Sequence, residues 1–249
     1  VTAVLTSSVD AKTARRIGFE MTPAIAARTR ASVGGTCLAA RLAVQHGAAV
    51  NLAGGSHHAS YESGAGFCVF NDVTVAARVA LEEGLCRKVA VIDCDVHHGD
   101  GTALIFKGDQ NVFTASLHCE QNWPREKPPS DLDLGLGKGA GDSDYLAALD
   151  GFIADVFAQA APDLVFYNAG VDPHESDRLG LLSLTDDGLR ERDRRVAEAC
   201  ASRGIPVVGV LGGGYEKDAF AVARRHSFMV DALASAAAPR ATSALSSPH

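Results

Sequence analysis

Short apolar runs alternate with longer segments of helical length along most of this chain, and this alternation restricts the possible folds most. Runs of strand length occupy residues 49–52, 89–93, 111–118, 163–168 and 206–211, and helix-length segments lie at 36–46, 71–84, 101–108, 144–161, 186–203 and 216–237. Such an order is typical of a parallel sheet covered on both faces. We therefore predict an α/β fold in which helices sandwich one parallel sheet, with residues 1–237 forming a single domain.

The remaining segments carry weaker patterns. We expect residues 1–5 to form a short extended piece and residues 6–29 to form loops and short helices. The helix at 36–46 should end at Gly47, because glycine commonly terminates helices. Residues 120–141 contain three prolines and four glycines, so we expect them to be irregular. The Ala/Ser/Pro-rich tail at 238–249 is expected to be disordered.

Composition narrows the class of protein. The 249 residues are 47% hydrophobic and carry a net charge of −7, which argues against non-specific binding to nucleic acid. No apolar run approaches the roughly 20 residues of a membrane span, and the N-terminus lacks the form of a signal peptide. The six cysteines include no Cys-x-x-Cys pair, so we expect reduced thiols in a cytoplasmic protein. The chain begins at Val1 and not at Met.

The stretch at residues 88–101 places charged groups at the end of a buried strand. Side chains alternate faces along a strand, so Val91, Asp93, Asp95 and His97 should point one way, opposite to Ile92 and its alternate neighbours. Burying these carboxylates and this imidazole without partners would cost several kcal/mol each. We therefore expect them to pair with cations or to bind a metal.

Four predicted strands end in unusual polar sequences. These ends carry the pair His57 and His58, then Asp95 with His97, then Asp172, and finally Tyr215. In open parallel sheets, ligands bind beyond the carboxyl ends of the strands. The four ends should therefore converge at one edge of the sheet and form one site.

Asp95, His97 and Asp172 together form a potential metal site. Two carboxylates and one imidazole leave a coordination position open, which is typical of a catalytic metal. Zinc bound in this way lowers the pKa of its water and polarises a carbonyl group, and Fe²⁺ or Co²⁺ would also accept these ligands. Taken alone, the pair Asp95 and His97 is equally consistent with an ion-paired strand end, and Asp172 with a turn before proline.

Three further residues have types suited to acyl transfer. His57 and His58 offer proton transfer, and Asp93 and Asp100 are available to orient the two imidazoles. Tyr215, after three glycines, could donate its phenolic proton to a developing oxyanion. In isolation, the histidines fit a surface pair and the tyrosine fits a packed turn.

Five motifs in sequence order resemble those of the histone deacetylase family. They read GGSHHA at 54–59, GFCVFND at 66–72, DCDVHHGDG at 93–101, AGVD at 169–172 and LGGGY at 211–215. The resemblance covers about 160 residues and implies the arginase/deacetylase fold. It further implies one zinc ion that is bound by Asp95, His97 and Asp172. His57 and His58 would be the acid/base histidines, with Asp93 and Asp100 behind them. Tyr215 would polarise the acyl carbonyl.

The same resemblance implies a substrate tube and a second ion. Gly66 and Phe67 would line the tube for an acyl-lysine side chain, Trp123 would supply a second aromatic wall, and Gly213 would lie at the substrate. A structural potassium ion would bind main-chain oxygens and one hydroxyl, the residues being Asp93, Asp95, His97, Ser116 and Leu117. Ureohydrolases share this fold but place an aspartate two residues after the histidine ligand, where this chain has Gly99. One catalytic metal is therefore favoured.

The sequence thus predicts a zinc-dependent hydrolase of acyl-amide bonds whose substrate is acetyl-lysine in a protein or a small acylated amine. We expect neither nucleic acid nor a membrane as a partner. An ester or lactone hydrolase would use the same site. A binding module without catalysis is the alternative from another class, although the chain keeps every metal, acid/base and tyrosine position.

Overall fold

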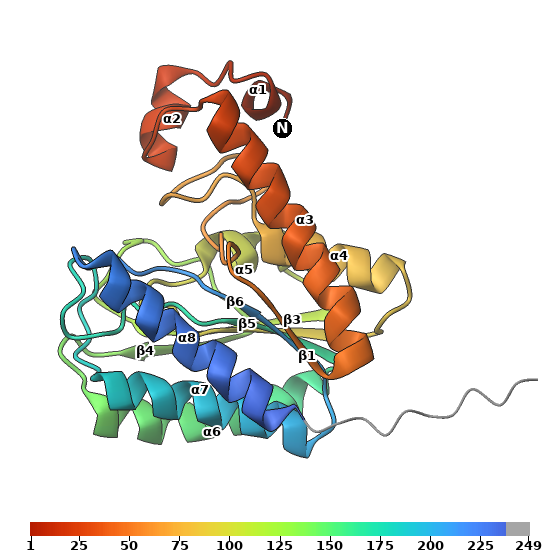
Figure 1. Ribbon diagram of the computed structural model, residues 1–249, viewed down its shortest axis with the longest axis vertical. Helices are drawn as coiled ribbons and strands as arrows, with labels where there is room; N and C mark the ends of the chain where they lie inside the picture. Colours follow the sequence, from red (N-terminus) through yellow and green to blue (C-terminus); the bar gives the residue numbers. More distant parts are fainter. Residues whose placement is uncertain (238–249) are drawn as a thin grey trace, which may run out of the picture.

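Six parallel strands form the centre of the molecule. In the computed structural model, which describes residues 1–237, they are ordered β1-β6-β5-β2-β3-β4 and all neighbours are parallel (Figure 1). Their bounds are β1 Ala48–Asn51, β2 Val89–Asp93, β3 Val112–Cys119, β4 Leu132–Leu136, β5 Leu164–Asn168 and β6 Val207–Val210. The predicted parallel α/β sheet is confirmed.

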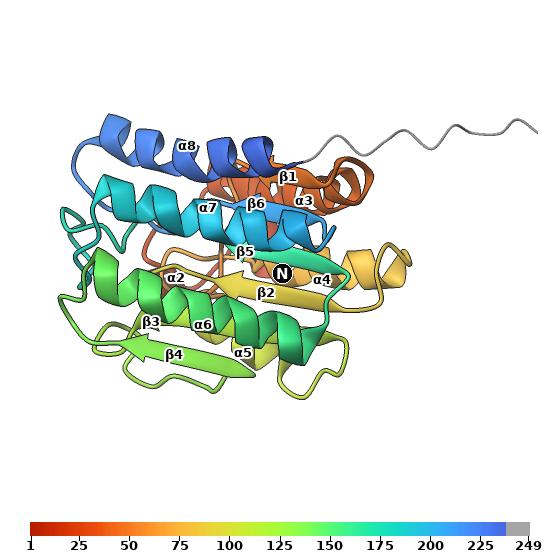
Figure 2. The same ribbon diagram turned by 90° about the horizontal axis from the view of Figure 1, so that it is seen from below.

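Helices cover both faces of the sheet, as predicted. On one face lie α3, α4 and α5, and on the other α6, α7 and α8 (Figures 1 and 2). The helix bounds are α1 Thr2–Leu5, α2 Ala11–Ile17, α3 Pro23–His46, α4 Asp72–Glu82, α5 Asp100–Phe106, α6 Asp142–Ala160, α7 Asp186–Ser202 and α8 Ala219–Ala236. Each helical layer buries its own apolar cluster against the sheet. The two cores fix the strand ends from both sides.

Strand β2 shows why one stretch can serve both core and site. Val91 packs in the cluster under α3 and α4, whereas Ile92 and Cys94 pack in the cluster under α6 and α7. All five residues of the strand are buried. Asp93 ends the strand on the face of Val91, in agreement with the predicted alternation, and the chain then turns at the carboxyl edge.

Three predicted elements were wrong. Residues 2–5 form helix α1 and not an extended piece. Helix α3 begins at Pro23, thirteen residues before the predicted start, with the Thr22 hydroxyl accepting a hydrogen bond from the Ile25 N–H. Within it, Gly35 gives Asn51 room to approach the helix, since a Cβ there would lie 3.0 Å from the Asn51 amide. Gly35 is therefore a packing contact within the helix.

The third correction concerns residues 120–141. This segment contains β4, an edge strand that pairs with β3 from Ala115 to Cys119. Its leucines are only half-buried, and its other residues are exposed. Such an edge strand has a weak apolar signal, and the surrounding prolines and glycines obscured it.

Other chain-wide features are consistent with the sequence. All six cysteines are buried free thiols. Among residues 1–237, no helix is both long and apolar enough to span a bilayer. The predicted tail at 238–249 lies outside the described residues.

Candidate metal centre and active site

Asp95, His97 and Asp172 come together beyond the ends of β2 and β5. The His97 Nδ1 lies 3.1 Å from Asp95 Oδ1 and 3.1 Å from Asp172 Oδ2, and all three side chains are buried. The other carboxylate oxygens accept main-chain hydrogen bonds, at 2.7 Å from the Gly213 N–H to Asp95 and at 2.9 Å from the Val96 N–H to Asp172. One oxygen of each carboxylate therefore faces the imidazole nitrogen.

This donor set fits a divalent metal ion. Burial and the neighbouring Asp95 charge raise the pKa of Asp172 to about 7, so the two carboxylates repel each other without a cation between them. The loops around them leave no space for side chains, because a Cβ on Gly170 or Gly213 would overlap the carboxylates. Two oxygens and one nitrogen leave an open position if the ion is zinc. The three predicted ligands are thus brought together.

Gly213 lies against the carboxylates of this centre. Its N–H donates to Asp95 Oδ2 at 2.7 Å, and a Cβ there would overlap Asp172. Gly213 therefore helps to hold the ligand loop, and its contact with substrate stays a prediction.

His57 and His58 each pair with a carboxylate. The His57 Nδ1 lies 2.7 Å from Asp93 Oδ2, and the His58 Nδ1 lies 2.6 Å from Asp100 Oδ1. The ring centroids are 3.9 Å apart. With both Nδ1 atoms taken, each Nε2 is available for chemistry, and that of His57 lies 3.7 Å from Asp95 Oδ1.

The two histidines have opposite protonation tendencies. Burial lowers the pKa of His57, but the carboxylates of Asp93 and Asp95 outweigh it and raise that pKa to about 9. Burial and the positive charge of His57 lower the pKa of His58 to about 4, and the Asp100 carboxylate offsets only part of this. A cation at the triad would lower the pKa values of both histidines. At neutral pH His58 is therefore a free base.

The loop that carries these histidines is anchored by the start of α4. Buried Asp72 accepts hydrogen bonds from the N–H groups of Gly55 and Ser56, at 3.0 and 2.8 Å. The Asn71 side chain donates to the Ala59 carbonyl at 3.2 Å. Since both residues sit at the N-terminus of one helix, the histidine loop is held on both sides.

Tyr215 follows β6 and borders the same centre. Its N–H donates to Asp177 Oδ2 at 2.6 Å, and its ring centroid lies 6.1 Å from that of His97. Burial and the carboxylates of Asp95 and Asp172 raise the pKa of the Tyr215 phenol. The hydroxyl therefore stays protonated and can only donate its hydrogen bond to an anion.

An aromatic cavity of about 400 Å³ opens above these groups. The Trp123 ring stands at 81° to the His58 ring with centroids 4.5 Å apart, and the Phe67 ring lies 5.7 Å from that of Tyr215. A glycine is needed at position 66, beside the rings of His58 and Trp123. A Cβ on Gly66 would overlap His58 and lie 2.9 Å from the Trp123 ring. The predicted lining residues thus border one space.

The residues predicted for potassium also lie together. Ser116 and Leu117 are buried in β3, and Ser116 pairs in register with Asp93 of β2. Asp95 and His97 follow in the turn after that strand. The Ser116 hydroxyl therefore lies beside the chain segment that supplies the other proposed oxygens.

Sequence reasoning missed a buried arginine behind the ligands. Arg192 of α7 is fully buried, and its Nη1 donates to the carbonyls of Gly170 and Cys94 at 2.5 and 3.2 Å. Asp193 balances its charge, with Oδ1 2.9 Å from the Arg192 Nε and 2.5 Å from the Tyr167 hydroxyl. Arg192 thereby ties together the two segments that carry the predicted zinc ligands. The spacing of Leu189, Arg192 and Val196 on one helix face could have revealed it.

Comparison with known proteins agrees with this geometry. The solved structure of the HD domain of HDA15 superposes with a TM-score of 0.74 at 25% identity, covering 94% of this chain and 70% of that one. An acetylpolyamine aminohydrolase from Burkholderia pseudomallei gives a TM-score of 0.67 at 24% identity, covering 83% and 63%. The chain therefore has the arginase/deacetylase fold.

Sequence comparison then gives the family. The family model described as "Histone deacetylase domain" matches residues 5–230, so the chain belongs to the histone deacetylase family. It is 48% identical over 92% of its length to an uncharacterized protein of Picosynechococcus, of which it covers 76%. It is 35% identical to histone deacetylase 2 of Arabidopsis thaliana and 31% identical to a probable deacetylase of Methanothermobacter thermautotrophicus, over 76% and 80% of this chain. It spans 49% and 63% of those two relatives.

Proposed function

We propose that this protein is a zinc-dependent hydrolase that removes the acyl group from acetyl-lysine or a related acylated amine. The observation that carries this proposal is the convergence of three buried metal donors, two histidine–carboxylate pairs and one protonated tyrosine below an aromatic cavity. Family membership supports the deacetylase class.

Asp95, His97 and Asp172 would hold the zinc ion. When bound, zinc would lower the pKa of a coordinated water and polarise the acyl carbonyl. The mixed oxygen and nitrogen donors would also accept Fe²⁺ or Co²⁺. A potassium ion beside Ser116 and Leu117 is supported by the register between β2 and β3.

The chain's own groups would manage the protons. His58, neutral and fixed by Asp100, accepts a proton from the attacking water and delivers one to the leaving amine. His57, paired with Asp93 through its Nδ1, keeps its Nε2 beside the metal donors, 3.7 Å from Asp95 Oδ1. The Tyr215 hydroxyl donates a hydrogen bond to the acyl oxygen, which becomes negative in the transition state.

The cavity supports an extended acylated amine as substrate. Phe67 and Trp123 offer aromatic faces to a methylene stem, and both stand half-exposed at the opening. Arg15 and Arg16 also line the cavity, so its wall carries positive charge although the protein as a whole is acidic. Acetyl-lysine peptides and acetylpolyamines both present a neutral acylated amine at the end of a methylene stem.

A substrate panel tests this proposal. Metal-free protein reloaded with zinc is assayed on an acetyl-lysine peptide, an acetylpolyamine, and an ester and a lactone of similar size. We expect zinc-dependent release of the amine from at least one amide. Turnover confined to the ester or lactone would identify the alternative hydrolase, and binding without turnover of any compound would identify a binding module.

A further inference from the structure

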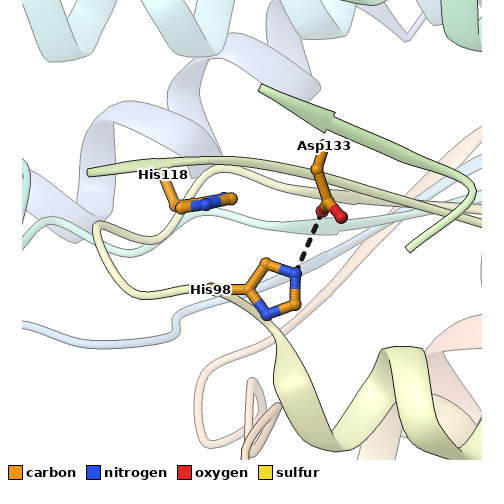
Figure 3. Close-up of side chains that lie close together, drawn as sticks. All are labelled: His98, His118 and Asp133. Atoms are coloured by element: carbon orange, nitrogen blue, oxygen red, sulfur yellow. Dashed lines mark hydrogen bonds and ion pairs between the residues drawn. The ribbon is translucent and has the colours of Figure 1, made fainter. Parts of the chain in front are cut away.

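A second group of potential metal ligands includes a residue of the turn after β2. It consists of His98, His118 and Asp133, which come from that turn, from β3 and from β4 (Figure 3). His98 directly follows His97 in the chain, and its ring points toward Asp133 of β4. No residue of this second group contributes to the active site described above.

The spacing of the second group suits a tetrahedral ion. The His98 Nε2 lies 3.0 Å from Asp133 Oδ1, and one ligand atom from each of the three residues lies within 4.8 Å of the others. Zinc bonds of 2.0–2.1 Å place adjacent ligand atoms about 3.3 Å apart in a tetrahedron. The distance from the His98 Nε2 to Asp133 Oδ1 lies close to this value.

Neighbouring groups hold the other atoms of His118 and Asp133, and the Ser130 hydroxyl lies 3.3 Å from the His98 Nε2. The Ser116 hydroxyl lies 3.0 Å from the His118 Nδ1 and can accept its N–H, which directs the Nε2 lone pair into the cluster. The Ser130 N–H donates to Asp133 Oδ2 at 2.8 Å, so Oδ1 remains for a ligand. Among residues 1–237, the buried His98 Nδ1 has no hydrogen-bond partner, so no protein group prevents it from carrying the ring proton.

The cluster is buried on one side and open on the other. The side chains of His98 and His118 are 0% and 2% exposed, whereas those of Asp133 and Glu120 are 31% and 59% exposed. An ion can therefore enter from solvent and still bind two desolvated imidazoles. Imidazole nitrogens combined with carboxylates favour zinc-like transition metals over Ca²⁺ or Mg²⁺.

We propose that His98, His118 and Asp133, with water in the fourth position, form a second site for a divalent transition metal such as zinc. The Asp133 carboxylate offsets part of the charge of the ion. A bound ion joins the turn after β2 to the edge formed by β3 and β4. This proposal concerns metal binding alone and does not depend on the proposed hydrolase activity.

Zinc stoichiometry tests the second site. Protein dialysed against a zinc buffer and then freed of excess metal is expected to hold two zinc ions per chain by elemental analysis. Asp133→Asn and His118→Gln should each keep only the zinc ion of the triad. Asp172→Asn should keep only the zinc ion of the second site. The double variant with Asp133→Asn and Asp172→Asn should hold no zinc. Glu126→Gln, an exposed carboxylate of the same loop, is the matched control and should keep two.

Cobalt substitution adds a spectroscopic measurement. Cobalt-loaded Asp172→Asn should show the visible absorption of a tetrahedral Co²⁺ ion, and addition of Asp133→Asn should abolish it. Asp133→Asn changes one partly exposed side chain without changing its size, so it keeps the test valid if His118→Gln fails to fold. One zinc in the wild type that Asp133→Asn retains, or two in Asp133→Asn, would overturn the second site and leave only a hydrogen-bonded histidine–aspartate pair. One zinc in the wild type that Asp133→Asn loses and Asp172→Asn retains would instead count against the proposed function.

Discussion

The candidate active site has a floor and a mouth that are built differently. The floor consists of the metal donors, the two histidine–carboxylate pairs and Tyr215, and the mouth consists of Phe67 and Trp123. On the floor, His57 is 4% exposed and Asp172 is 0% exposed, and each polar group has a defined partner. At the mouth, Phe67 and Trp123 are 49% and 45% exposed and contribute aromatic faces. A rigid floor suits chemistry that is the same for every acyl group, whereas an open aromatic mouth suits selection of the rest of the substrate. Floor substitutions should therefore reduce turnover for all substrates, and mouth substitutions should change preference.

The largest effect is expected for Asp172→Asn. The asparagine keeps the carbonyl oxygen that accepts the Val96 N–H but loses the negative charge that faces His97. Loss of the metal removes several kcal/mol of transition-state stabilisation, which corresponds to about 10³-fold or more in turnover. Elemental analysis and kcat measure the two effects. Full zinc occupancy at the triad in this variant would show that Asp172 is not a ligand.

His58→Gln is expected to lower kcat about 10³-fold with no loss of zinc, since general acid–base groups contribute 10²–10⁴. The pH profile adds a second measurement. Because the pKa of His58 lies near 4, its base form persists below the usual imidazole value of about 6.5 and is lost only as the pH falls toward 4.

Asp100→Asn makes the pH prediction specific. The Asp100 carboxylate raises the pKa of His58, so its removal should shift the acidic limb of kcat/KM to lower pH. An unchanged limb would assign that titration to a different group. His46→Gln, on the surface end of α3, is the matched histidine control and should leave the profile unchanged.

Tyr215→Phe should lower kcat about 10²-fold, the lower end of the range for one oxyanion donor. The phenyl ring keeps the contact with Phe67, and the main-chain bond to Asp177 does not involve the side chain. Zinc content and thermal stability should therefore match those of the wild type. Equal activity would exclude the hydroxyl from catalysis and leave Tyr215 as part of the wall.

Sequence predicted the floor better than the rest of the molecule. The alternation along β2 placed Asp93 on the face of Val91, and the rule for parallel strands placed Asp95, Asp172 and Tyr215 at one edge. These inferences depend on local period and strand direction, which a single chain displays directly. The site residues within the motifs could be predicted without knowing where the helices begin and end.

Features that depend on distant partners were not predictable in this way. Within α3, Gly35 is explained only by the approach of Asn51 from β1, and β4 is recognised only by its pairing with β3. Arg192 lies in a charged helical run, and only its contacts with the Gly170 and Cys94 carbonyls show why it is buried. Similarly, His98 and Asp133 become neighbours only through the sheet.

Trp123→Ala should have the smallest effect and the clearest bearing on the difference between floor and mouth. Its ring borders the cavity beside His58. Within the described residues 1–237, the ring donates no hydrogen bond to a catalytic group. Loss of its apolar contact with a methylene stem, about 1.5 kcal/mol, corresponds to roughly a tenfold rise in KM with little change in kcat. Trp123→Phe should recover part of the loss. If Trp123→Ala instead lowered kcat for every substrate and left KM unchanged, the ring would act by positioning His58 and would belong to the floor.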